Sequence, residues 1–141
     1  MVRMAWYDTA QLPIIEAAEA RGDWFTAIVL CATQIEYNGC VKIKEHLTSL
    51  KVDTDLADAV LEPLYLRDVV ECLLVMKVID KKERGTILRI NKARNDFVHR
   101  RENVKFKRGK EAEEEYQPLV EEAKRILREK LDVMRLFVGK G

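Results

Sequence analysis

Apolar residues recur along almost the whole chain at the three- and four-residue intervals of an α-helix. One stretch places Trp24, Ala27, Ile28, Cys31 and Ile35 on a single face. A β-strand would need apolar residues at every second position, and the chain has no convincing run of that kind and no Asn-Gly hairpin signal. The sequence therefore predicts an all-α protein, a bundle of four to five helices.

Start and stop signals divide this pattern into elements. Asp23 is a good N-cap for a long helix, and Gly39 is a candidate kink within it. Pro63 separates a short helix from a longer one, and a further helix covers about Glu83 to Arg101. We expect the longest helices near Asp23–Leu50 and Pro118–Val138.

Size and composition predict one globular domain over residues 1–141. The chain is 48% hydrophobic and 35% charged, which is enough to bury a core without disulfides or a metal. Its three cysteines form no CxxC pair, which favours a reducing compartment. No stretch approaches the length of a membrane helix, and the N-terminus has no apolar leader. We expect a cytoplasmic protein without membrane contacts.

The positive charge is concentrated in one segment. Residues 81–110 contain twelve Lys or Arg against three acids, a net charge of +9, although the whole chain carries only +1. A glutamate-rich run follows directly, with acids at 111 and 113–115. Such a segment creates a local positive field suited to nucleic acid, although a solvated helix face is the simpler interpretation.

Common enzyme motifs are absent. The chain has no GxGxxG, P-loop, GxSxG or HExxH pattern. Its two histidines, His46 and His99, are far apart in sequence and have no clustered carboxylates beside them. We expect no metal site and no cofactor.

The basic segment contains an arginine in an unusual place. On a helical wheel Arg94 falls within the apolar arc, where its guanidinium must meet an internal carboxylate or open into a cleft. Asn95 and His99 are neighbours at i and i+4, and Asp96 can pair with Arg100 in the same way. A structural ion pair for Arg94 and a helix-dipole role for His99 are the simpler interpretation. The arc itself consists of Ile87, Ile90, Ala93, Phe97 and Val98.

The run Arg94-Asn95-Asp96-Phe97-Val98-His99 resembles the R-x4-H signature of the HEPN domain superfamily. The preceding residues 72–80 are similar to the helix end and turn that lead into the motif helix of that family. The resemblance implies an all-α bundle and, in many members, a metal-independent endoribonuclease whose site forms across a homodimer. HEPN toxins paired with a nucleotidyltransferase tend to carry a tyrosine two residues after the histidine, where this chain has Arg101.

The resemblance implies a small set of catalytic roles. Arg94 would stabilise the charge that develops on the phosphorane, and His99 would transfer a proton. Asn95 would orient His99 or the phosphate, and Asp96 would orient a residue of the site or only pair with Arg100. The RNA backbone would be held by Arg100, Arg101, Lys105, Lys107 and Arg108.

Two other classes of function stay open. A non-catalytic HEPN-like module would use the same basic face to bind nucleic acid or a protein. A purely structural interaction protein would dock a neighbour through its acidic final helix. The sequence identifies no antitoxin or other protein partner, no RNA target and no cleavage preference.

Overall fold

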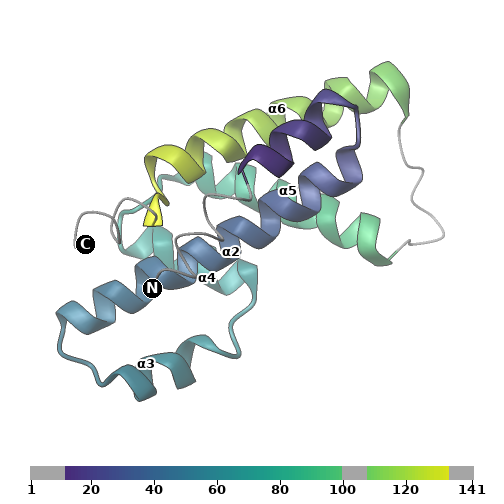
Figure 1. The fold of residues 1–141 in the computed structure, drawn as a ribbon. Helices are drawn as coiled ribbons and strands as arrows, with labels where there is room; N and C mark the ends of the chain where they lie inside the picture. The colour runs from purple at the N-terminus through teal and green to yellow at the C-terminus, as the bar shows by residue number, and fades with distance from the viewer. Residues whose placement is uncertain (1–11, 100–107, 134–141) are drawn as a thin grey trace.

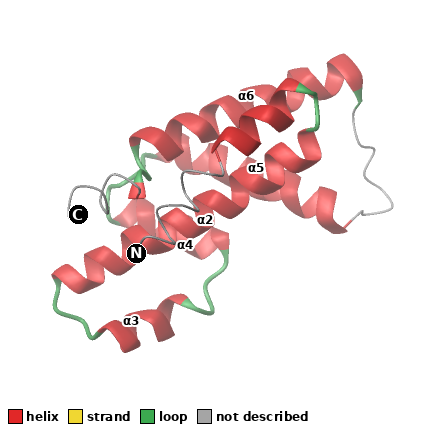
Figure 2. Cartoon of the chain, in the orientation of Figure 1, coloured by secondary structure: helices red, strands yellow, loops and turns green. Residues whose placement is uncertain are grey.

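The protein is an all-α bundle in the computed structural model, which describes residues 12–99 and 108–133 (Figures 1 and 2). Within those ranges no strand is present, and the fold class predicted from the sequence is confirmed. Residues 12–99 and 108–129 hold six helical segments, one more than the largest number expected. They are residues 12–20, α2 (Trp24–Ser49), α3 (Thr54–Leu61), α4 (Leu66–Val75), α5 (Lys81–His99) and α6 (Gly109–Glu129).

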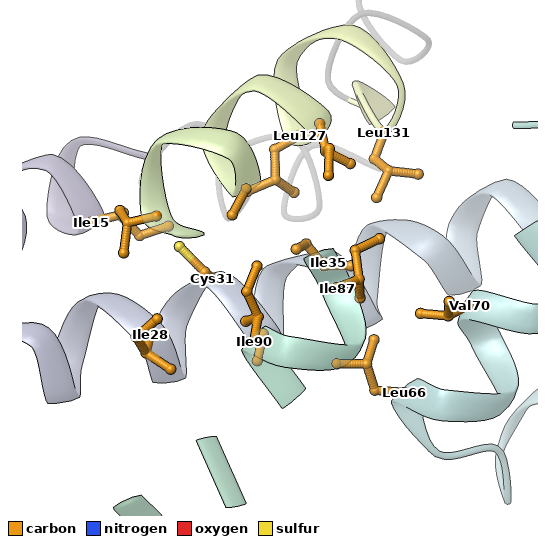
Figure 3. Close-up of a cluster of buried hydrophobic side chains, with 14 of the residues drawn as sticks. Ile15, Ile28, Cys31, Ile35, Leu66, Val70, Ile87, Ile90, Leu127 and Leu131 are labelled. Atoms are coloured by element: carbon orange, nitrogen blue, oxygen red, sulfur yellow. The ribbon is translucent and has the colours of Figure 1, made fainter. Parts of the chain in front are cut away.

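Helix α2 is the central element, and α3, α4, α5 and α6 all contact it (Figure 1). Asp23 caps its N-terminus as predicted, because the carboxylate accepts a hydrogen bond from the Thr26 amide at 3.1 Å. Cys31 and Ile35 of α2 are buried against α5 and α6 (Figure 3). In the described ranges no helix, α2 included, is long and apolar enough to cross a membrane.

Gly39, where the sequence suggested a kink, lets α4 approach α2 closely. Helix α2 continues unbroken to Ser49. A Cβ atom at Gly39 would lie 2.6 Å from Val69 Cγ1 and 3.1 Å from Leu73 Cδ1, both on α4. Because Val69 is β-branched, its Cγ1 has little freedom to move aside. The missing side chain therefore sets the distance between the two helices.

Helix α6 begins earlier and ends earlier than the expected span Pro118–Val138. It starts at Gly109 and continues through Pro118 to Glu129, while residues beyond 133 lie outside the described part of the chain. The end has a tertiary cause: the Leu131 carbonyl accepts a hydrogen bond from Nδ2 of the buried Asn38 at 2.9 Å. That carbonyl is directed at α2 rather than along a continuing helix.

Buried ion pairs attach α6 to its neighbours. Arg125 on α6 donates to the buried Glu83 carboxylate at the start of α5 at 2.8 Å. Lys124 donates to Glu19 in helix 12–20 at 2.6 Å, and both side chains are about nine-tenths buried. Burial raises the pKa of the Glu19 carboxyl, and the hydrogen bond with Lys124 acts in the opposite direction. These pairs fix where α6 lies along the bundle.

Replacing Gly39 should test the close approach of α2 and α4. We expect Gly39→Ala to lower the free energy of unfolding by about 1–3 kcal/mol through overpacking, although alanine is the better helix former. Gly85→Ala is the matched control, because a Cβ there meets nothing within 4 Å, and it should stabilise by about 0.5–1 kcal/mol. Urea unfolding measures both, and equal stabilisation by the two changes would contradict the packing role of Gly39.

Candidate functional site

The guanidinium of Arg94 is held between two helices. On α5 it projects toward α2, where Nη1 donates to the Glu36 carboxylate at 3.2 Å. Its Nη2 donates to Oδ1 of Asn91, one turn earlier on α5, at 2.9 Å. The side chain is 20% exposed. Of the two environments that the sequence left open for Arg94, the structure provides a carboxylate.

These two bonds orient Arg94 without using all of its donors. A guanidinium carries five N–H groups, and Glu36 and Asn91 occupy two of them through the bonds described. The remaining donors and the residual exposure allow a further anion to bind. Glu36 offsets the positive charge, so Arg94 combines a fixed geometry with a reduced net field.

Asn95 and Asp96 lie on a different side of α5, at an open hollow of about 280 Å³ beside α4. We call this the α4–α5 hollow. Asp96 accepts a hydrogen bond from Lys92 Nζ at 3.2 Å, whereas the partner expected from the sequence, Arg100, lies outside the described residues. The lining residues are Arg67, Leu88, Asn91, Lys92, Asn95 and Asp96.

His99 is the last residue of α5 and is exposed. It lies five positions after Arg94, which is about 140° around the helix axis. Arg94 is directed toward α2, whereas His99 lies on the face of Asn95, one turn further on, without a hydrogen bond between the two side chains. The two residues therefore lie on different sides of α5.

Apolar surface adjoins this end of α5. Phe97 contacts Phe25 of α2 and Tyr116 of α6, with ring centroids 5.6 and 5.2 Å apart. Phe25 remains 47% exposed, and Val98, next to His99, is 51% exposed. Phe25 and Val98 are thus exposed apolar side chains on or beside the motif helix.

The residues expected to hold the RNA backbone lie almost wholly outside the description. Arg100, Arg101, Lys105 and Lys107 belong to residues 100–107, and only Arg108 is placed, exposed at the N-cap of α6. The prediction for these five residues remains a prediction.

A metal site and a cysteine nucleophile have little support in the described ranges. There, no group of three or more His, Cys, Asp or Glu side chains is arranged to hold a metal ion. Burial raises the pKa of the Cys31 thiol to about 12, so this side chain is a core residue rather than a nucleophile.

Three residues of this region were not predicted from the sequence. Asn91 stands three residues before Arg94, so helical spacing could have identified it as a partner. Glu36 and Arg67 come from α2 and α4, and no local pattern connects them with α5. Their proximity depends on how the three helices pack.

Comparison of the chain with family models, with curated proteins and with solved structures finds no match. The argument for function therefore rests on the residues and geometry described above.

Removing Arg94 should cost stability because it leaves Glu36 and Asn91 without their donor. We expect Arg94→Ala to lower the free energy of unfolding by about 1–3 kcal/mol. Glu36 is 32% exposed, so water compensates part of the loss that a fully buried pair would suffer. Guanidinium unfolding monitored by circular dichroism measures the change.

Lys92→Ala is the control for this prediction. Lys92 also pairs with a carboxylate on α5, but its side chain is 79% exposed, and we expect a change of about 0–0.5 kcal/mol. Combining Glu36→Gln with Arg94→Met should recover part of the loss, because no charge is then left unpaired. Equal effects of Arg94→Ala and Lys92→Ala would exclude a structural role for the Glu36 pair.

Proposed function

We propose that this protein is a metal-independent endoribonuclease of the HEPN type, with Arg94 and His99 as its catalytic residues. The proposal is supported by the agreement of three features: the R-x4-H motif, its position at the end of a helix in an all-α bundle, and the +9 segment around it. The observation that carries it is the guanidinium of Arg94, held by Glu36 and Asn91 with donors to spare.

The reaction uses the nucleophile that RNA itself contains. A base removes the proton of the 2′-hydroxyl, and the 2′-oxygen attacks the adjacent phosphorus. The P–O5′ bond breaks as the O2′–P bond forms, and an acid gives a proton to the departing 5′-oxygen. The products are a 2′,3′-cyclic phosphate and a 5′-hydroxyl. Because the nucleophile belongs to the substrate, no water has to be activated by a metal ion.

Arg94 takes the charge-stabilising role and His99 a proton-transfer role in this chemistry. The free N–H groups of Arg94 donate to the phosphoryl oxygens, where negative charge increases in the transition state. His99 transfers one of the two protons, and solvent accepts or supplies the other. Asn95 and Asp96 line the α4–α5 hollow and contribute to binding rather than to the transfer itself.

A homodimer completes the site in this proposal. Because Arg94 and His99 project from different sides of α5, one chain supplies a phosphate ligand or a proton donor to a given cleft, but not both. A two-fold axis beside the exposed Val98 and Phe25 would bring Arg94 and His99 from two chains together. It would also cover this apolar surface.

A non-catalytic binding module is the second candidate function. The ion pair between Arg94 and Glu36, at 3.2 Å, favours it, since the pair explains the arginine without any substrate. Such a module would bind nucleic acid through the basic segment and would not depend on His99.

Replacing His99 should separate the two candidates. We expect His99→Ala to reduce cleavage of a fluorescent single-stranded RNA in EDTA by about 10²–10⁴-fold, because it removes the proton-transfer group. Binding of the RNA should persist. His46→Ala is the matched control, since His46 is an exposed histidine in the last turn of α2.

Other results of the same assay would refute the proposed mechanism or favour the binding module. Cleavage of the 2′-deoxy strand at the rate of the RNA, or a requirement for Mg²⁺, would refute attack by the 2′-hydroxyl. Tight RNA binding without cleavage by the unaltered protein would instead favour the binding module.

The dimer is tested by a charge placed on the proposed interface. We expect the protein to sediment as a dimer at micromolar concentration, and Val98→Glu to convert it to a monomer that does not cleave RNA. Val75→Glu is the control, because Val75 is 81% exposed at the end of α4, on another part of the bundle. A monomeric, active protein would refute the composite site.

A further inference from the structure

We propose that the α4–α5 hollow binds one nucleotide of the RNA strand, with Arg67 on the phosphate and Asn95 on the edge of the base. This inference rests on the proposed ribonuclease function and adds a residue, Arg67, that lies outside the motif helix. It assigns Asn95 to substrate binding rather than to the orientation of His99.

The charge balance of the hollow favours a single phosphate. Lys92 is neutralised by Asp96 at 3.2 Å. Arg94, bonded to the lining residue Asn91, is neutralised by Glu36 at 3.2 Å. Arg67 forms no ion pair with another described residue. The hollow therefore presents one uncompensated positive charge, on a guanidinium whose paired N–H groups suit a phosphate.

The amide groups supply directional hydrogen bonds beside that charge. Asn91 uses its Oδ1 to accept from Arg94 at 2.9 Å, which leaves its NH₂ group as a donor. Asn95 has an acceptor and two donors, and it forms no hydrogen bond with another described side chain. Donor and acceptor atoms side by side match the edge of a nucleobase. Leu88 adds apolar surface for the ring.

Size and position agree with a single nucleotide. The hollow measures about 280 Å³, just below the roughly 300–1,000 Å³ of drug-sized small-molecule sites. It lies between α4 and the same face of α5 on which His99 stands, one turn beyond Asn95. A strand whose scissile phosphate lies near His99 would place a neighbouring nucleotide at Asn95.

Small probes test the hollow without any cleavage. The protein is titrated with each of the four nucleoside 5′-monophosphates and with ribose 5-phosphate, and the side-chain amide signals of Asn91 and Asn95 are followed by NMR. We expect saturable shifts of both signals with at least one nucleotide. Arg67→Ala should lower the affinity for that nucleotide and for ribose 5-phosphate alike. We expect a change of about tenfold, because one charged hydrogen bond is lost.

Asn95→Ala should distinguish the base from the phosphate. The variant should lower the affinity for the nucleotide by about fivefold. The affinity for ribose 5-phosphate, which has no base, should not change. Arg128→Ala is the matched control, an exposed arginine on α6 away from the hollow, and it should change neither affinity. In RNA cleavage, Arg67→Ala should raise KM with kcat nearly unchanged, because it removes binding of a nucleotide that does not react.

The outcomes separate this inference from the proposed function. Absence of saturable shifts, or equal effects of Arg67→Ala and Arg128→Ala, would overturn the nucleotide site even if the protein cleaves RNA. Nucleotide binding that depends on Arg67 and Asn95 in a protein that cleaves no RNA would support the site and refute the ribonuclease.

Discussion

The close contact between α2 and α4 at Gly39 is the constraint on which the rest of the bundle depends. A Cβ atom at this position would lie 2.6 Å from Val69, so α4 can pack at this distance only against a residue without a side chain. Helix α5 packs against both α2 and α4, and its placement follows from theirs. The distance of Arg94 from Glu36, and of Asn95 from Arg67, is therefore set partly at a glycine that belongs to neither pair.

In the proposed function, a structural role and a chemical role share one side chain, that of Arg94. Its position among apolar residues makes an unpaired guanidinium costly, and Glu36 removes that cost. The same pairing fixes the direction of the remaining N–H groups, which reduces the reorganisation needed when a phosphate binds. An arginine held in this way suits a site that must stabilise developing charge.

Much of the fold could be predicted from the sequence, because helical periodicity and capping are local properties. Asp23 caps α2, and Pro63 separates α3 from α4, as residues close in the chain indicated. The sequence did not predict the end of α6. The helix ends close to the Leu131 carbonyl, which accepts a hydrogen bond from Asn38, 93 positions away in the chain. The spacing of apolar residues does not predict such a bond.

For the candidate site, too, some features follow from local sequence and others only from the packing of helices. The sequence by itself determined that Arg94 would stand in the apolar arc of a helix and would need a partner, because a wheel depends only on the rise and turn of one helix. Only the tertiary structure decided that the partner is Glu36 and that Arg67 lies beside Asn95. The physical reason is that contacts between helices depend on the distances and rotations at which they pack, which Gly39 and the buried side chains set together.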